Sequence, residues 1–284
     1  MSARTRLAAV AALAVAATLV LSACSSSSSD VQKTAGSSDS GYVTPGKLTI
    51  GTSEPAYAPW VIDDKPQSGK GFEAAVAYAV ADKLGFTKSD VVWVRDTFDQ
   101  AIAPGPKDFD FNIQQFSITD ERKKAVDFSS PYYETSQVVI TYAGSKADGV
   151  TTLAGLKDLL IGAQTGTTSF TEAEQEIKPT KGVQVFNSND DAVAALKAKQ
   201  VDAIVVDLPT AFYITSSELD DGAIVGQLPT VSGEKGDQFG LVLAKDSPLT
   251  AKVSKAVDEL RADGTLDKLQ AQWLNSEGNA PILK

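Results

Sequence analysis

The sequence predicts an α/β protein that consists of two units of similar size. Short β-rich runs alternate with amphipathic helical stretches, an order typical of βαβ units in which a mostly parallel sheet is flanked by helices. The same order of strands and helices restarts after Gly149. A secretory signal and a polar linker precede the first unit, so we expect the folded part to begin at about residue 42.

The first 23 residues have the form of a lipoprotein signal peptide. Arg4 and Arg6 precede an apolar stretch over residues 7–21, and the segment LSAC ends at Cys24. The apolar stretch is shorter than the ~20 residues that span a membrane and has no charged C-terminal flank. We therefore expect cleavage before Cys24 and a lipid anchor on its thiol. Residues 24–41 are small and polar, which is typical of a flexible tether.

Charge and composition exclude several functional classes. The net charge is -10 at pH 7, and removal of the signal with its two arginines makes the chain more negative still. This charge argues against nucleic acid as a partner, because affinity for phosphate backbones comes from clustered Lys and Arg. The chain contains no histidine, which excludes Ser-His-Asp and Cys-His nucleophile systems and the common zinc sites. We expect no cofactor, no metal and no enzymatic activity.

The first unit is predicted from five patterned segments. Residues 47–53 form a short β-rich run, and residues 71–85 carry Phe72, Val76, Val80 and Leu84 at the four-residue spacing of an amphipathic helix with a glycine stop. Residues 90–96 predict a second strand, and residues 98–103 a short helix. A third strand is expected within the stretch FDFNIQQFSIT, residues 109–119.

The second unit repeats this order. A strand over residues 160–163 is followed by a Gly-Thr-Thr turn and a helix that continues to residue 177, and residues 188–200 predict another helix. The nearly continuous apolar run VDAIVVD, residues 201–207, is typical of a strand that is buried on both faces. From residue 239 to residue 274 one strand and two helices are expected, with the helices separated at Asp263 and Gly264.

Several motifs together resemble the extracellular solute-binding proteins of polar amino-acid ABC transporters. The stretches GYVTPGKLTIGTSEPAYAPW, GKGFEAAVAYAVADKLG, FSITDERKKAVDFSSPYY, IGAQTGTTS, VDAIVVD and RADGTLDKLQAQWL occur in that family's order. The S-I-T-x-x-R run followed by D-F-S-x-P-Y is the most specific part. The resemblance implies a type II periplasmic-binding-protein fold, with lobe 1 over residues 42–134 and 232–284 and lobe 2 over residues 135–231. Hinge crossovers are then expected near residues 134–136 and 229–232.

The resemblance also implies a function. The expected protein is a monomer held at the outer face of the plasma membrane, which captures a free amino acid between its lobes and delivers it to the transmembrane subunits of an ABC permease. Two alternatives remain open, a dehydratase-like enzyme of the same fold and an amino-acid sensor, because the fold alone does not separate these functions.

The charged run over residues 120–124 contains the first candidate ligand-binding residue. One interpretation is a solvated helix start. The other is that Arg122 faces the cleft, where a guanidinium binds a carboxylate through two parallel hydrogen bonds. Ser117 and Thr119 directly precede the run and favour the cleft. The resemblance implies that Arg122 binds the α-carboxylate of the ligand.

The turn QTGTTS supplies the second set of candidates. The backbone N–H groups of Thr167 and Thr168 follow Gly166 at a predicted helix start, where unpaired donors attract an anion. Helix capping by these residues is the alternative, and both interpretations can hold. The resemblance places this turn against the same ligand carboxylate as Arg122.

The remaining candidates are expected to bind the ammonium group and the side chain of the ligand. Asp207 ends an apolar strand, where a carboxylate requires a partner; it either caps the helix at Pro209 or, as the resemblance implies, binds the α-ammonium together with Ser117 Oγ. The other candidates are the aromatic residues Tyr57, Trp60 and Phe98, the adjacent amides Gln114 and Gln115, and Glu54, which lies near a position that can meet a basic side chain. Aromatic residues are more often part of the core than ligand contacts, and this alternative applies above all to Trp60. These residues do not specify which amino acid is bound.

Overall fold

The structure is a computed structural model that describes residues 41–229, 236–274 and 280–284. The predicted signal peptide, Cys24, all but the last residue of the tether and most of the predicted hinge at residues 229–232 lie outside these ranges. The strands are β1 (Leu48–Thr52), β2 (Val91–Arg95), β3 (Phe111–Asn112), β4 (Val126–Phe128), β5 (Tyr133–Thr135), β6 (Gln137–Tyr142), β7 (Ile161–Gln164), β8 (Gln184–Phe186), β9 (Ala203–Asp207), β10 (Gly222–Gln227), β11 (Asp237–Phe239) and β12 (Val242–Ala244). The helices are α1 (Phe72–Lys83), α2 (Phe98–Ile102), α3 (Leu153–Leu156), α4 (Thr168–Glu172), α5 (Asn189–Lys197), α6 (Leu208–Tyr213), α7 (Thr250–Ala262) and α8 (Thr265–Trp273).

Two five-stranded sheets define two lobes. The first lobe contains the sheet β2-β1-β3-β12-β4 with α1, α2, α7 and α8, and the second contains the sheet β10-β6-β9-β7-β8 with α3 to α6. Each sheet is mixed, because β12 in the first and β6 in the second run antiparallel to both of their neighbours. The other strand pairs, β1 with β2 and β3 and β7 with β8 and β9, are parallel.

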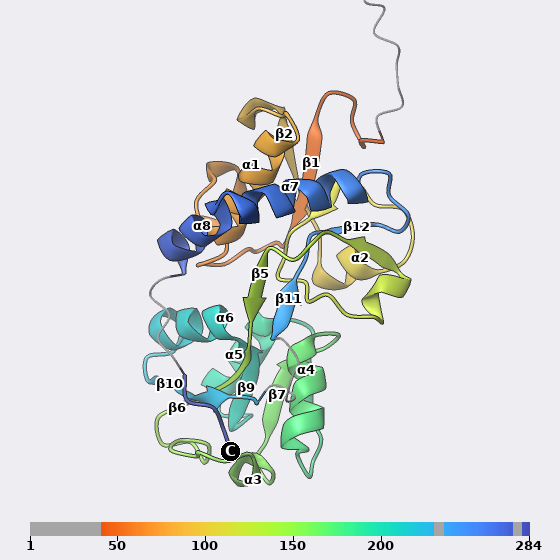
Figure 1. Cartoon of the computed structure of the whole chain (residues 1–284). Coiled ribbons are helices and arrows are strands. Elements are labelled where there is room, and N and C mark those ends of the chain that lie inside the picture. The colour runs from red at the N-terminus through yellow and green to blue at the C-terminus, as the bar shows by residue number, and fades with distance from the viewer. Residues whose placement is uncertain (1–40, 230–235, 275–279) are drawn as a thin grey trace, which may run out of the picture. The chain divides into compact units, whose positions relative to one another are not determined.

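A third, two-stranded sheet connects the lobes. Figure 1 shows β5 and β11 between the two groups of helices and strands, and they pair antiparallel with Asp237 opposite Thr135. The chain reaches the second sheet through β5 and β6 and returns to the first after β10 and β11. None of the helices within the described ranges is long and apolar enough to cross a membrane.

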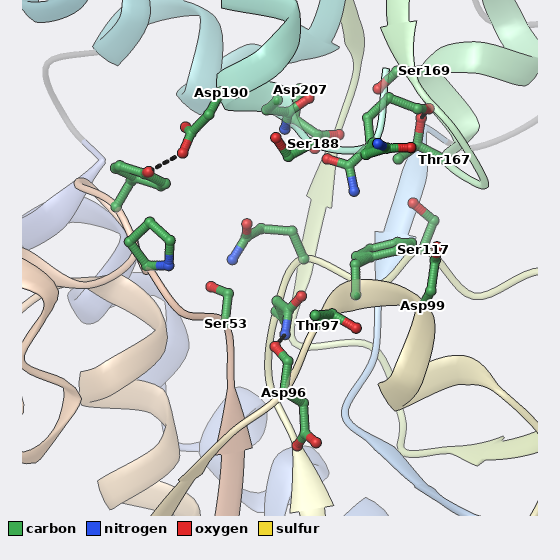
Figure 2. A pocket seen from close by; sticks show the side chains of 18 of the residues that line it. Ser53, Asp96, Thr97, Asp99, Ser117, Thr167, Ser169, Ser188, Asp190 and Asp207 are labelled. Carbon is green, nitrogen blue, oxygen red and sulfur yellow. Dashed lines mark hydrogen bonds between the residues drawn. The ribbon is translucent and has the colours of Figure 1, made fainter. Parts of the chain in front are cut away.

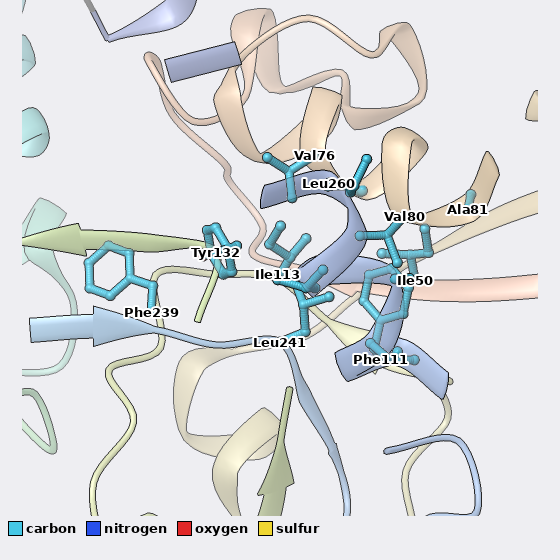
Figure 3. Packing of buried hydrophobic residues seen from close by; sticks show 14 of the residues in the cluster. Ile50, Val76, Val80, Ala81, Phe111, Ile113, Tyr132, Phe239, Leu241 and Leu260 are labelled. Carbon is cyan, nitrogen blue, oxygen red and sulfur yellow. The ribbon is translucent and has the colours of Figure 1, made fainter. Parts of the chain in front are cut away.

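The core of the first lobe lies between the sheet and α1, α7 and α8 (Figure 3). The predicted spacing of α1 is confirmed, because Phe72, Val76 and Val80 are fully buried; Leu84 follows the helix end and is partly buried. Figure 3 shows Val76 and Val80 of α1 beside Leu260 of α7 and Ile50 of β1. A polar residue of α1, Glu73, is also fully buried, which the apolar spacing did not predict.

The sheet of the second lobe is covered on both faces. Side chains alternate along β9, so Ala203 and Val205 contact one hydrophobic cluster while Ile204 and Val206 contact another. All four are at most 1% exposed. The prediction of a strand buried on both faces is therefore confirmed.

Gly71 brings the loop after β1 against the start of α1. Its φ angle is 102°, and a Cβ atom at this position would lie 2.4 Å from the carbonyl oxygen of Trp60. Only glycine fits so close an approach in this conformation. The same carbonyl oxygen accepts a hydrogen bond from Glu73 N at 3.0 Å. Gly71 thereby fixes the loop that carries Tyr57 next to the first turn of α1.

Candidate functional site

A cavity of about 220 Å³ lies between the two lobes. Its lining comes mainly from the segments that follow β1, β2 and β3 in the first lobe and β7, β8 and β9 in the second. Segments at the carboxyl ends of parallel strands are the usual location of a binding site in α/β proteins. Figure 2 shows the lining side chains, with Ser53, Thr97, Asp99 and Ser117 on one side and Asp190, Ser188, Asp207 and Ser169 on the other.

Nearly all residues that the sequence proposes as ligand contacts line this one cavity. They are Glu54, Tyr57, Phe98, Gln114, Gln115, Ser117, Arg122, Thr167, Thr168 and Asp207. Whether each of them contacts a ligand stays a prediction.

Trp60 is the candidate that the structure places elsewhere. It is 3% exposed and packs in the core of the first lobe against Phe72, Tyr133 and Phe239. Its Nε1 donates to Thr210 Oγ1 of the second lobe at 3.1 Å. Trp60 lines a second cavity of about 330 Å³, which shares Tyr57 and Gln115 with the first. A large aromatic side chain that follows a tight loop is often part of the core, and this is the case here.

Arg122 joins the two lobes at the cavity wall. Its Nη1 donates to the carbonyl oxygen of Ser117 at 2.8 Å, and its Nη2 donates to that of Gly166 in the second lobe at 2.9 Å. The guanidinium carbon lies 5.2 Å from the centre of the Phe98 ring. The next two basic residues, Lys123 and Lys124, have exposed side chains and pair locally with Asp120 and Glu121. The charged run therefore combines one cavity residue with a solvated face.

The Gly-Thr-Thr turn begins α4 as predicted. Thr167 occupies the N-cap position, and its Oγ1 accepts from Phe170 N at 3.1 Å, so the capping interpretation holds. Thr168 Oγ1 lies 3.1 Å from Ser117 Oγ of the first lobe. Both threonines line the cavity close to Gly166, whose carbonyl oxygen Arg122 binds. The turn can thus cap the helix and present N–H groups to an anion.

Asp207 lies in a polar cluster with Gln137 and Asp237. The single side-chain amide of Gln137 donates from Nε2 to Asp207 Oδ1 and to Asp237 Oδ2, in each case at 2.8 Å. Ser117 Oγ donates to Asp237 Oδ2 at 3.1 Å. Asp207 occupies the N-cap position of α6, but its side chain makes no capping hydrogen bond. The capping alternative for Asp207 is therefore wrong.

The charges of this cluster suit a cationic group. Burial, followed by the negative charge of Asp237, raises the pKa of Asp207 to about 7, although Gln137 and Arg122 act in the opposite direction. Burial and the same two aspartates raise the pKa of Glu172 to about 8. A cation beside Asp207 would relieve this repulsion. In the described part of the chain, His, Cys, Asp and Glu residues form no group of three or more that could hold a metal ion.

The rest of the lining is acidic and aromatic. It includes Glu54, Asp96, Asp99 and Asp190 together with Tyr57 and Phe98. The Tyr57 hydroxyl of the first lobe donates to Asp190 Oδ2 of the second, which Figure 2 marks with a dashed line. This hydrogen bond is one of the contacts between the two lobes.

The two glutamines occupy different environments. Gln114 is 5% exposed, and its Nε2 lies 3.4 Å from the carbonyl oxygen of Asp96. Gln115 has a φ angle of 51° and contacts the buried Glu73 through both its backbone N and its Nε2. Amide groups therefore line the cavity as expected, but Gln115 is held by a carboxylate that sequence reasoning did not connect with it.

Sequence reasoning missed several polar residues of the site. Asp96 and Asp190 could have been found, because one is the last residue of a predicted strand and the other lies in the first turn of a predicted helix. Gln137 and Asp237 carry no comparable signal. Gln137 meets Asp207 because β6 pairs antiparallel with β9 in a register that places these two residues opposite each other.

Comparison with known proteins identifies the family. The family model for bacterial extracellular solute-binding proteins, family 3, matches residues 48–276. The chain is 30% identical over 276 residues to the arginine-binding extracellular protein ArtP of Bacillus subtilis, covering 93% of this chain and 96% of that protein. It is 31% identical over 236 residues to the L-arginine-binding protein of Pseudomonas aeruginosa, covering 78% and 86%.

Solved structures agree with these relatives. An ancestral arginine-binding protein bound to glutamine matches with a TM-score of 0.67 and 32% identity, over 81% of this chain and 98% of that one. The predicted two-lobed periplasmic-binding-protein fold is confirmed, with the correction that each sheet is mixed. These relatives are binding proteins, which confirms the prediction of a binding protein and not an enzyme. The chain belongs to the bacterial extracellular solute-binding proteins, family 3.

Proposed function

We propose that this protein is the amino-acid-binding component of an ABC importer and that its ligand is a free α-amino acid with a cationic side chain. The observation that carries the proposal is the charge of the cavity, because its lining, within the described part of the chain, includes five residues with carboxyl side chains and one with a guanidinium, Arg122. The α-carboxylate of the ligand binds to Arg122, and its α-ammonium group binds to Asp207. Of the other carboxyl groups in the lining, that of Asp99 lies beside Gly166 and that of Asp96 accepts a hydrogen bond from Asn112 Nδ2, which leaves those of Glu54 and Asp190 for the side chain. The names of the relatives, which bind arginine, agree with this choice.

The proposed binding mode uses both lobes. Arg122 of the first lobe and the N–H groups at the start of α4 in the second bind the carboxylate. Asp207 of the second lobe and Ser117 Oγ of the first bind the ammonium. Tyr57 and Phe98 flank the aliphatic part of the side chain. A ligand held in this way bridges the lobes, so its binding favours the closed arrangement.

Calorimetric titration with arginine, lysine, ornithine, citrulline, glutamine and glutamate tests the proposal. The three cationic amino acids should bind more tightly than the neutral ones, and glutamate should bind least. Asp190→Asn should reduce the preference for arginine over citrulline, since the substitution removes a charge but keeps a hydrogen-bond acceptor for Tyr57. The matched control is Asp191→Asn, because Asp191 is adjacent in α5 but does not line the cavity. Preferential binding of glutamate, or no binding of any amino acid, would contradict the proposal.

The partners follow from the same assignment. The loaded protein delivers its ligand to the transmembrane subunits of an ABC permease, and it acts as a monomer outside the cell. Cys24 carries a lipid that anchors the protein to the outer face of the plasma membrane. The LSAC segment and the polar tether that follows it support this anchor. Light scattering coupled to size-exclusion chromatography, on the chain without its signal peptide, measures the molar mass and so tests whether the protein is a monomer.

A further inference from the structure

Glu73 is a fully buried carboxyl group whose hydrogen bonds converge on a residue of the ligand cavity. It lies in the first turn of α1 and is 0% exposed. Its Oε1 accepts from the backbone N of Gln115 at 2.7 Å and from the Tyr132 hydroxyl, and its Oε2 accepts from Gln115 Nε2. Both nitrogen atoms of Gln115 are thus bound to the same carboxylate.

This arrangement orients the side-chain amide of Gln115. An ionised carboxylate only accepts hydrogen bonds, so the NH₂ group of the amide must face Glu73 and the carbonyl oxygen must face away from it. Among the residues that the structure describes, no donor reaches Gln115 Oε1, and Gln115 lines both interlobe cavities. The part of Gln115 that remains available to a ligand is a hydrogen-bond acceptor.

The backbone of Gln115 is fixed by the same contact. Its φ angle of 51° lies in the left-handed region, which non-glycine residues seldom adopt. The hydrogen bond from its backbone N to Glu73 stabilises this conformation. Glu73 itself is held in place by Tyr132 and by the helix start that Gly71 packs against Trp60. The carboxylate therefore positions Gln115 from the core of the first lobe.

We propose that Glu73 is a positioning residue for ligand specificity, which binds both nitrogen atoms of Gln115 and so presents the Gln115 carbonyl oxygen to the cationic side chain of the ligand. This inference rests on the proposed function. It adds a determinant that lies outside the cavity and acts through a hydrogen-bond acceptor, in addition to the acidic residues of the lining.

The substitution Glu73→Gln tests the proposal because it should invert the amide of Gln115. The new side chain keeps one oxygen for Gln115 N and Tyr132 but places an NH₂ group where Oε2 stood. The χ3 torsion of glutamine is roughly two-fold, so the Gln115 amide can turn over and accept from this group. Gln115 would then present its own NH₂ group to the ligand, which disfavours a cationic side chain.

The readout is the ratio of the dissociation constants for citrulline and arginine, which have side chains of equal length and differ in charge. Burial raises the pKa of Glu73 to about 7. The titrations are therefore carried out at pH 8, where Glu73 is ionised. We expect Glu73→Gln to lower the preference for arginine about tenfold to hundredfold, the effect of one hydrogen bond to a charged group. Tyr132→Phe removes one contact that holds Glu73 but leaves both hydrogen bonds between Glu73 and Gln115, so it should lower the ratio less than Glu73→Gln does.

Two further measurements complete the test. Gln115→Met should lower the ratio as well, and Glu73→Gln should have no additional effect in that background. In the unliganded wild-type protein, the NMR chemical shift of the Gln115 side-chain amide nitrogen should change as Glu73 titrates. This measurement tests the contact between Glu73 and Gln115 even if the Glu73→Gln variant does not fold.

The inference is overturned if Glu73→Gln weakens arginine and citrulline equally, if Gln115→Met leaves the ratio unchanged, or if the Gln115 nitrogen does not titrate. Failure of the proposed function looks different, because the wild-type protein would then show no preference for arginine over citrulline. The NMR titration still tests the contact between Glu73 and Gln115 in that case.

Discussion

Replacing Arg122 by alanine should weaken amino-acid binding by roughly 3 to 5 kcal/mol, the range for breaking a buried charge pair. This corresponds to an increase in the dissociation constant of roughly 140-fold to 4,000-fold, since each 1.4 kcal/mol is a factor of ten. The guanidinium is held by the carbonyl oxygens of Ser117 and Gly166 and lies over the ring of Phe98. In the alanine variant the ligand carboxylate would enter the cavity without its counter-charge, and one contact between the lobes would be lost.

Arg122→Lys should recover only part of this loss. A lysine ammonium is a compact charge, and it cannot reproduce the planar set of donors with which Arg122 reaches two carbonyl oxygens and a carboxylate. Burial lowers the pKa of Arg122, but an arginine remains charged in proteins. A lysine in the same surroundings would also lose charge more readily.

The neighbouring lysines provide matched controls. Lys123 and Lys124 have side-chain exposures of 52% and 72%, and each pairs with an acidic residue three positions earlier. Exposed pairs of this kind contribute about 1 kcal/mol or less, so Lys123→Ala and Lys124→Ala should leave the affinity nearly unchanged. Calorimetry with arginine on the three alanine variants checks the expectation. Similar losses at all three positions would mean that the basic run acts as a diffuse field, which would refute the assignment of Arg122.

Three further outcomes are expected. Affinity should fall up to tenfold per pH unit below about 7, because the ligand ammonium must displace the proton that Asp207 binds there; equal affinities in calorimetry at pH 5.5 and pH 8 would contradict this. Cys24→Ser should abolish lipidation and release the protein from membranes without a change in ligand affinity, and its retention in the membrane fraction would count against the anchor. Saturating arginine should reduce the radius of gyration in small-angle scattering, since a ligand that binds both states equally shifts nothing; an unchanged radius would exclude ligand-driven closure.

Regular elements could be predicted from the sequence wherever one periodicity dominated. The apolar spacing of α1 and the uninterrupted run of β9 reflect burial of a helix face and of both faces of a strand, and the structure has both. The mixed character of the sheets could not be predicted in this way. The direction of β12 and β6 depends on pairing with strands that are distant in sequence, and neither strand carries a local mark of its direction.

The residues of the candidate site also differ in whether a local sequence signal marks them. Arg122, Thr167 and Asp207 stand next to local signals, a charged run, a glycine turn and the end of an apolar strand. Gln137 and Asp237 acquire their roles only through tertiary contacts, because one amide bridges carboxylates that are separated by 30 positions in sequence. From the sequence pattern alone, Glu73 is a polar position of an amphipathic helix. Its burial becomes intelligible only with the left-handed backbone of Gln115 beside it.

In the proposed binding mode, the location of the Asp207 cluster connects ligand binding with closure of the lobes. Gln137 begins β6 directly after the crossover strand β5, and Asp237 begins the other crossover strand, β11. Two carboxylates near a single amide at this point repel each other, and burial strengthens the repulsion. In the proposed binding mode the ligand ammonium neutralises this repulsion next to the hinge while its carboxylate engages Arg122 and α4 from both lobes. A zwitterion therefore stabilises the closed arrangement at two separate points, whereas an amine or a carboxylic acid alone can stabilise it at only one.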